Sequence, residues 1–274
     1  MFPRVKFALV VLFLASTAVG CGLPLTNPSF DLSIAQARRE LDSMKDDDVQ
    51  RLPKLDRPVV ILDGTLSWGF YPWNLKNTIA DRTRGGTFVT VSYPLAVDFD
   101  DCRRTVVKAV DRELGVANDR ETVEVDVIGM SLGGVVAIWS SLEDPSLGKR
   151  LKIRNLYTIG SPLSGSNFAS VFGDVSLIPI HRDLRPGTPF LQRLAKAKLD
   201  YPVISYTRLD DGLVGARFAA LPGHRVYWLS NPPLEISHLA TMTDPRIFAD
   251  ILRRLRGEPT LALAEPTPLP LDAR

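Results

Sequence analysis

The sequence has few cysteines and histidines, with two cysteines and three histidines among 274 residues. Two cysteines cannot build a disulfide framework, and no cluster of cysteine and histidine has the spacing of a zinc site. An excess of one charge is also missing, because 33 basic and 31 acidic residues leave a net charge of +2. The two extra cations, Arg4 and Lys6, lie in the first 20 residues, which contain no acid. The remaining chain has no basic field or Lys/Arg-rich run, so we expect no nucleic-acid partner.

The amino terminus lacks a hydrophobic run long enough to span a membrane. The apolar run at residues 7–19 is shorter than the roughly 18 residues that a bilayer requires. It follows Arg4 and Lys6, as the apolar region of a secretory signal peptide does. We therefore interpret residues 1–20 as an export signal.

Small residues lead into the first cysteine. Ala18-Val19-Gly20-Cys21 resembles the lipobox of bacterial lipoproteins, with Ala18 where leucine is usual. That resemblance implies cleavage before Cys21, a lipid on its sulfur and a membrane anchor in the bacterial cell envelope. In Gram-negative lipoproteins, aspartate after the cysteine is the inner-membrane retention signal, and this chain has Gly22 at that position instead. The alternative is ordinary signal cleavage, with Cys21 free or paired with Cys102 and the protein periplasmic or secreted.

The chain divides into a globular centre and two flanking segments. A composition of 45% apolar and 23% charged residues is that of a globular protein. Residues 21–56 mix Pro, Asn and Ser with one amphipathic helix at residues 32–44, which predicts an arm or tether. Residues 257–274 contain four prolines and no periodic pattern, so we expect a loose tail. The predicted domain is residues 57–256.

Within the domain, short apolar or β-branched runs alternate with segments of helical period. This alternation predicts an α/β domain with a mostly parallel sheet of about six strands and helices on both faces. The predicted strands are residues 59–62, 87–92, 123–128, 153–159, 203–206 and 225–229. The predicted helices are residues 75–82, 101–114, 132–142, 189–197 and 245–255.

A nucleophile motif joins a predicted strand to a predicted helix. Gly129-Met130-Ser131-Leu132-Gly133 has the form G-x-S-x-G, followed by a further glycine and an apolar helix. A serine on so sharp a turn needs neighbours without bulk, which the glycines provide. The N-terminus of the following helix favours negative charge near the serine. Ser131 is therefore the candidate nucleophile, and the alternative is a structural serine in a tight turn.

With this motif in this context, residues 57–256 resemble the α/β-hydrolase superfamily, specifically bacterial lipases and carboxylesterases. The resemblance implies an α/β-hydrolase fold, a Ser-His-Asp triad in that chain order and no cofactor or metal.

In the family, the histidine of the triad follows the last strand of the sheet. His238 lies between the strand predicted at residues 225–229 and the helix at residues 245–255, where the family places its histidine. A neutral imidazole there can accept the serine proton and return it to the leaving group. His224, at the start of the last strand, and His181, in a loop, are assigned structural roles.

The acid is expected after the next-to-last strand, where Asp210 and Asp211 are adjacent. Family members commonly show Asp, two further residues and then Val, which fits Asp211 and Val214. Gly212 suits the turn that would direct this carboxylate toward His238. We assign Asp211 to the triad and interpret Asp210 as a turn or solvent-facing residue.

The oxyanion hole is expected to use two backbone N–H groups. One belongs to Leu132, which follows the serine, and the other to Thr65, in the loop after the first strand. That loop looks like the His-Gly-x turn of lipases, with Asp63 in place of the usual histidine and Gly64 retained. An ordinary strand-end Asp-Gly turn is the alternative.

Two further stretches could shape the pocket. Residues 161–200 form a long insertion that could serve as a lid, an acyl-binding wall or a buried cap. The aromatic residues at 68–73 could line an acyl pocket or fill the interface between sheet and helix. Cys102 is expected to be a passive thiol because neighbouring acids disfavour its thiolate.

Together these features predict an exported, lipid-anchored serine esterase or lipase that acts on acyl esters through Ser131, His238 and Asp211. The same triad could instead serve an acyltransferase or an amidase. A third possibility is a non-catalytic lipoprotein that keeps the fold as a binding module. The sequence leaves the acyl chain, the alcohol group and the oligomeric state undetermined.

Overall fold

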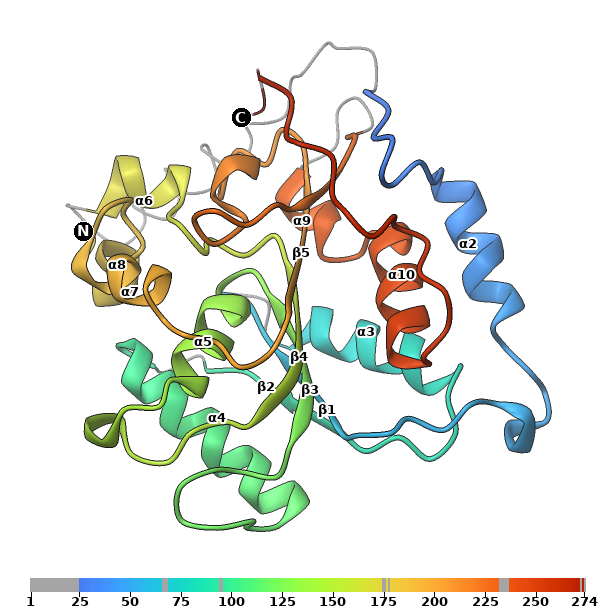
Figure 1. Cartoon of the computed structure of the whole chain (residues 1–274), viewed down its shortest axis with the longest axis horizontal. Helices are drawn as coiled ribbons and strands as arrows, with labels where there is room; N and C mark the ends of the chain where they lie inside the picture. Colours follow the sequence, from blue (N-terminus) through green and yellow to red (C-terminus); the bar gives the residue numbers. More distant parts are fainter. Residues whose placement is uncertain are drawn as a thin grey trace, which may run out of the picture.

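A six-stranded parallel sheet forms the centre of the computed structural model, which describes residues 25–65, 69–93, 96–173, 176, 178–231, 237–271 and 273. All adjacent strands pair in parallel, in the order β2-β1-β3-β4-β5-β6 (Figure 1). The strands are β1 (Val59–Leu62), β2 (Phe88–Val91), β3 (Val125–Met130), β4 (Ile153–Ile159), β5 (Val203–Arg208) and β6 (Tyr227–Leu229).

Helices cover both faces of this sheet. In Figure 1, α4 (Phe99–Leu114) and α5 (Leu132–Ser141) lie on one side of the strands, and α3 (Phe70–Ala80) and α10 (Pro245–Leu255) lie on the other. The shorter helices follow the later strands: α6 (Asn167–Phe172), α7 (Pro179–Asp183), α8 (Pro189–Ala195) and α9 (Ser237–Thr241). Short 3-10 helices occur at Val49–Arg51, Pro145–Leu147 and Ala216–Phe218.

Alternating side chains of the strands supply the two halves of the core. In β1, Val60 and Leu62 pack with α4 and α5, whereas Val59 and Ile61 pack with α3 and α10. All four are fully buried, as expected for a parallel strand covered on both faces. The predicted α/β-hydrolase fold class, with six parallel strands and helices on both faces, is confirmed.

Some element boundaries differ from the prediction, because residues that are typical of turns lie within a strand or helix. Strand β3 extends through Gly129 and Met130, because Gly129 lies in register with both Leu62 and Thr158 of the neighbouring strands. Helix α3 begins five residues earlier than predicted, at Phe70. Helices α6, α7 and α9 were not predicted, because each is only five or six residues long and too short to show a period.

The amino-terminal arm packs against the domain in residues 25–56. Helix α2 (Ile34–Ser43) is capped by Ser33 and lies beside α10, where Glu40 pairs with Arg253 at 2.5 Å (Figure 1). Phe30 is buried with its ring near those of Tyr206 and Tyr227, at 6.2 Å between centroids. The prediction of a tether is therefore wrong for residues 25–56, because their apolar side chains have a complementary surface on the domain.

The carboxy-terminal segment is also held in place. The carboxylate of Asp250, which is fully buried, accepts the backbone N–H groups of Leu261 and Ala262 at 2.7 and 2.9 Å. The indole of Trp228 donates to the carbonyl oxygens of Thr267 and Pro268 at 3.1 Å. The expectation of a loose tail is wrong for the described residues. Their backbone groups are not in a helix or strand, but side chains of the domain form hydrogen bonds with them.

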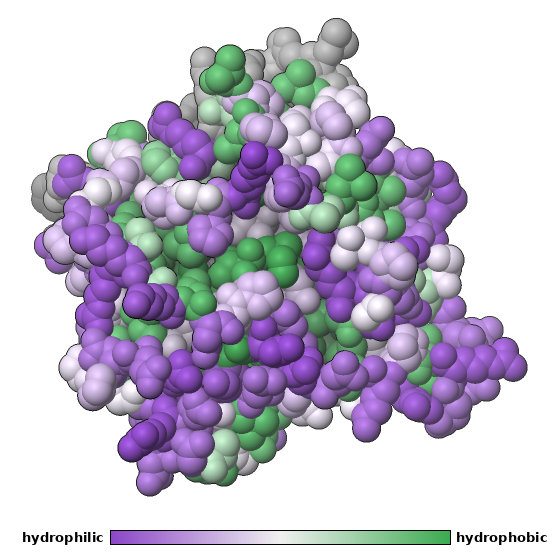
Figure 2. All heavy atoms as spheres, in the orientation of Figure 1, coloured by the Kyte–Doolittle hydropathy of each residue, from purple (hydrophilic) through white to green (hydrophobic). Residues whose placement is uncertain are grey.

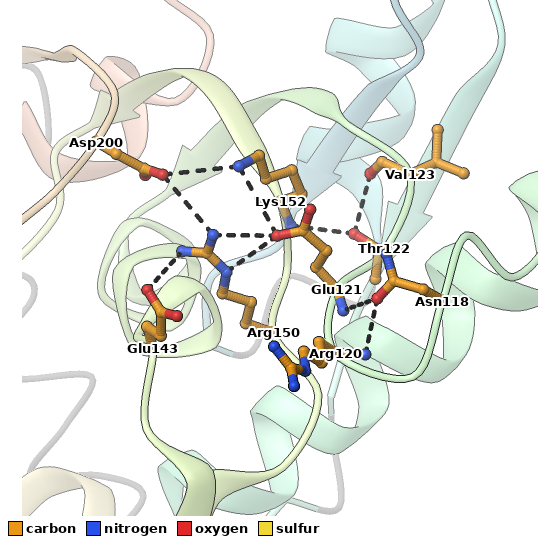
Figure 3. A network of polar contacts seen from close by, with 9 residues as sticks. All are labelled: Asn118, Arg120, Glu121, Thr122, Val123, Glu143, Arg150, Lys152 and Asp200. Atoms are coloured by element: carbon orange, nitrogen blue, oxygen red, sulfur yellow. Dashed lines mark hydrogen bonds and ion pairs between the residues drawn. The ribbon is translucent and has the colours of Figure 1, made fainter.

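A charged network joins the loops at the amino-terminal edge of the sheet (Figure 3). The guanidinium of Arg150 contacts the carboxylates of Glu121, Glu143 and Asp200, and Lys152 contacts Glu121 and Asp200. These residues precede β3, β4 and β5, so the network fixes the edge opposite the end of β3 that carries Ser131.

The surface is mixed in character. On the face shown in Figure 2 the apolar side chains form separate patches among hydrophilic ones. Among the helices that the structure describes, none combines the length and apolar character needed to cross a membrane.

Candidate active site

Ser131 lies on a sharp turn between β3 and α5. Its backbone has φ 49° and ψ −121°, a conformation that residues with a side chain rarely adopt. Two glycines make the turn possible. A Cβ on Gly129 would lie 2.5 Å from the Cα of Gly134, and one on Gly133 would lie 2.3 Å from the carbonyl oxygen of Leu62. Both contacts are too short, so the G-x-S-x-G pattern follows from close backbone packing.

The structure brings Ser131, His238 and Asp211 into one hydrogen-bonded row. The Oγ of Ser131 is 3.0 Å from Nε2 of His238, and Nδ1 of the same ring is 2.8 Å from Oδ2 of Asp211. Asp211 is fully buried and His238 is 6% exposed. The burial of the carboxylate and the imidazole shields their hydrogen bond from water, while Ser131 remains partly accessible.

The two adjacent aspartates have different environments. The Oδ1 of Asp211 accepts the backbone N–H groups of Leu213 and Val214 at 3.1 and 2.9 Å, which directs Oδ2 toward His238. Asp210 is exposed and adopts φ 59°. The local turn therefore selects Asp211, and the acceptance of two amides by one oxygen explains the spacing to Val214.

The three histidines lie on different segments of the chain. His238 lies on α9, with residues 232–236 before it outside the described part of the chain. His224 is exposed in the loop before β6. His181, on α7, borders the same cavity as Ser131, which the sequence did not indicate.

The loop after β1 lies directly against the serine turn. A Cβ on Gly64 would be 3.1 Å from the Cβ of Ser131, which is a tight contact that glycine avoids. Thr65 follows it, and Thr65 and Leu132 both border the cavity that contains Ser131. The two residues predicted to supply backbone N–H groups thus border the same cavity as Ser131.

Asp63 organises this loop. Its buried carboxylate accepts the N–H groups of Gly64 and Gly69 at 2.7 and 2.9 Å and the hydroxyl of Ser92 at 2.7 Å. The hydroxyl of Tyr93 donates to the backbone carbonyl oxygen of Asp63 at 2.5 Å. Burial raises the pKa of the Tyr93 hydroxyl well above its usual value, so it remains a donor. Asp63 therefore has a defined set of partners on both sides of the loop.

A largely apolar cavity of about 420 Å³ opens over the row. We call it the catalytic cavity. The long insertion at residues 161–200 supplies part of its wall through Phe168, His181 and Leu184, and the 68–73 segment supplies Tyr71. Phe70 and Trp73 are exposed, and Trp68 lies outside the described residues. The same insertion also supplies Pro162 and Ser166, and further lining residues are Met130, Leu213, Val214, Leu239 and Met242.

The cysteines do not contribute to this cavity in the described part of the chain. Cys102 is buried, and burial together with Asp98 and Asp101 raises the pKa of its thiol to about 12, which makes it unreactive. Cys21 lies outside the described residues, so the anchor stays a prediction. No group of three His, Cys, Asp or Glu suited to a metal ion occurs among the residues that the structure describes.

Comparison with protein-family models and with curated protein sequences gives no match for this chain. Among solved structures, a Bacillus licheniformis lipase in mature form is 15% identical, over 75% of this chain and 96% of its own, with a TM-score of 0.48. A lipase-esterase related protein from Clostridium acetobutylicum is 10% identical over 74% and 97%, with a TM-score of 0.46. Naproxen esterase from Bacillus subtilis is 12% identical over 84% and 99%, with a TM-score of 0.42. The fold assignment itself is based on the strand order and the Ser131 turn.

Proposed function

We propose that this protein is a serine hydrolase that cleaves carboxylic esters through an acyl-enzyme. The observation that carries the proposal is the continuous row from Ser131 through His238 to Asp211, at 3.0 and 2.8 Å, beneath an apolar cavity. Each member has the partner that its role requires, since the serine contacts the base and the base contacts a buried acid.

In the first half of the reaction, Ser131 Oγ attacks the ester carbonyl carbon while His238 Nε2 takes its proton. Asp211 holds the imidazole by Nδ1–H and stabilises its positive charge, without taking the proton. The N–H groups of Leu132 and Thr65 stabilise the oxyanion. When the tetrahedral intermediate collapses, the C–O bond to the alcohol breaks and His238 gives its proton to the departing oxygen.

In the second half, water attacks the acyl-enzyme. His238 takes a proton from the water, a second tetrahedral intermediate forms in the same hole, and the bond to Ser131 breaks as His238 returns the proton to Oγ. This leaves a carboxylic acid and the free enzyme. With an alcohol or amine in place of water, or an amide in place of the ester, the same steps would describe the acyltransferase and amidase alternatives.

Labelling with a fluorophosphonate probe tests this proposal directly, because such probes react with activated serines. Ser131→Ala should remove both labelling and hydrolysis of p-nitrophenyl esters. Ser140→Ala is the matched control: Ser140 is buried on α5, which starts next to Ser131, and its hydroxyl has no partner among the described residues. It should be labelled like the wild type. An unlabelled wild-type protein would instead favour a binding module.

We also propose that the protein is exported and anchored to a membrane of the bacterial envelope by lipid on Cys21. This proposal is supported by the sequence alone, through the apolar run at residues 7–19 and the lipobox-like Ala18-Val19-Gly20-Cys21. Several acyl chains on one cysteine would hold the protein firmly, whereas one chain would not. Mass spectrometry of the mature amino terminus tests it, with Cys21→Ser expected to release the activity from membranes. An unmodified Cys21, or a terminus beyond it, would indicate a periplasmic or secreted enzyme.

A further inference from the structure

A second cavity adjoins the catalytic cavity. It has a volume of about 290 Å³, and we call it the side cavity. Gly64, Thr65 and Leu132 border both cavities, which therefore meet beside the proposed oxyanion hole. Ser131 and His238 line only the catalytic cavity. The site therefore has two connected cavities, of which only the catalytic cavity reaches the side chains of Ser131 and His238.

The chemistry of the reaction assigns one part of the ester to each cavity. The departing alcohol oxygen must lie near Nε2 of His238 to receive its proton, so the alcohol part belongs in the catalytic cavity. The acyl part points away from that oxygen, on the other side of the carbonyl carbon. The side cavity, reached past Thr65 and Leu132, is the space available to it.

His181 lies where the two cavities meet, since it borders both of them. Its Nδ1 is 2.9 Å from Oγ of Ser176, and its ring packs edge-on against Phe168 with 5.3 Å between centroids. The same Ser176 Oγ accepts the backbone N–H of Ile178 at 3.2 Å. The imidazole is thus held by a ring contact and by one nitrogen.

These contacts define the hydrogen-bonding character of the other nitrogen. Burial lowers the pKa of the His181 imidazole, so the ring is neutral at neutral pH and carries one proton. We assign the donor role in the Ser176–His181 bond to the hydroxyl, whose oxygen already accepts the N–H of Ile178; in that assignment Nδ1 is the acceptor and the ring proton lies on Nε2. Among the described residues no group accepts a hydrogen bond from that Nε2. A substrate atom in the cavity can do so.

We propose that His181 is a specificity-determining residue that binds a hydrogen-bond acceptor, such as an ether, keto or hydroxyl oxygen, on the acyl chain of the substrate. The side cavity is also bordered by Ala96, Ile178 and Ile180, which are apolar, and by Asp63, Ser92 and Tyr93. The hydroxyls of Ser92 and Tyr93 both donate to Asp63, so the preferred chain is aliphatic with one such oxygen. This inference rests on the proposed esterase function and specifies its substrate class.

Matched pairs of p-nitrophenyl esters test it. Methoxyacetate has the shape of butyrate, and 4-methoxybutanoate has the shape of hexanoate, with one oxygen in place of a methylene. For each pair, kcat/KM is measured in the wild type, in His181→Phe and in His181→Gln. Comparing enzymes cancels the intrinsic reactivity of each ester. The oxygen-to-methylene ratio in at least one pair should fall roughly 3- to 10-fold in His181→Phe, which is the size of one neutral hydrogen bond. It should be largely kept in His181→Gln, whose amide retains a donor.

Other results separate the two proposals. If the wild type is labelled by fluorophosphonate and hydrolyses all four esters, but both ratios are the same in His181→Phe, the role of His181 is wrong and the esterase function stands. If the ratios fall equally in His181→Phe and His181→Gln, shape rather than hydrogen bonding is responsible, and the proposal is again wrong. If the wild type neither reacts with the probe nor hydrolyses any ester, both proposals are overturned.

Discussion

The hydroxyl of Ser237 donates a hydrogen bond to the backbone carbonyl oxygen of Leu209 at 2.7 Å. Ser237 directly precedes His238, and Leu209 lies two residues before Asp211. The bond therefore joins the two chain segments that supply the base and the acid, alongside the direct contact between their side chains. Ser237 is 2% exposed and does not line the catalytic cavity, so its effect on the reaction must pass through His238 and Asp211.

Replacement of Ser237 by alanine should lower kcat roughly 3- to 10-fold with little change in KM, because the imidazole loses alignment while the cavity keeps its lining. The free energy of unfolding should fall by about 1 kcal/mol. Ser141→Ala is the control, since Ser141 is also buried and donates to the carbonyl oxygen of Ile138 at 2.8 Å, away from the cavity. If both variants lose stability and neither loses turnover, the Ser237 bond is purely structural.

The adjacent acids should differ strongly on conversion to amides. Asp211→Asn should reduce kcat by about three to four orders of magnitude, because asparagine holds the imidazole in the wrong tautomer. Asp210→Asn should change kcat less than about twofold, because the residue is exposed and asparagine tolerates its positive φ. Steady-state kinetics of the two purified variants measure this difference in kcat. The opposite ranking would transfer the role of the acid to Asp210.

Asp63→Asn should impair the oxyanion loop. The carboxylate accepts three hydrogen bonds from residues that the structure describes, and an amide cannot accept all three because one of its two polar atoms is a donor. We expect kcat to fall roughly 10- to 100-fold, since one misplaced oxyanion donor costs up to a few orders of magnitude. Ser92→Ala, which removes one of the three, should have a smaller effect. Full activity of Asp63→Asn would mean that the loop backbone holds its position unaided.

Asp250→Ala should destabilise the protein by about 3 to 5 kcal/mol, because it removes a buried charge and leaves its partners unpaired. The carboxylate also accepts the hydroxyl of Tyr206 at 2.6 Å and pairs with Arg254 at 2.8 Å, besides the two amides of the tail. Asp42→Ala, which breaks an exposed pair with Lys45, should change stability little. Urea titration measures both, and limited proteolysis should cut the tail sooner in Asp250→Ala. A tail that stays protected would show that the indole of Trp228 suffices to hold it.

The sequence predicted the sheet well because most strand residues are apolar and buried, with polar residues such as Thr90 and Arg154 at exposed positions. Strands β1 and β4 and helix α10 have the predicted limits, since hydrophobic residues end where turn residues begin. The docking of the arm and the tail could not be predicted in the same way. The arm depends on partners far away in the chain, such as Arg253 for Glu40 and Trp228 for Asn27, which are 213 and 201 residues apart. The tail depends on single polar groups of Asp250 and Trp228, which lie 11 to 40 residues before their partners.

The geometry of the candidate site was predictable where motif and chain order act together. Ser131, Asp211 and His238 follow from the order of elements, because parallel strands place their carboxyl ends on one edge. His181 and Ser237 gave no signal, because a single histidine or serine in a loop has no periodic or motif context. Asp63 was visible only as a departure from the family pattern, and its partners Gly69 and Ser92 became evident from the fold.

The docked arm limits how far the domain could lie from a membrane. Residues 25–56 belong to the folded body, so a lipid on Cys21 would be separated from it by only four residue steps, or at most about 15 Å of extended chain. A protein attached through so short a linker would be confined to a thin layer at the bilayer surface. Its encounters would then depend on the number of ester molecules per unit of membrane area rather than on their concentration in the surrounding volume.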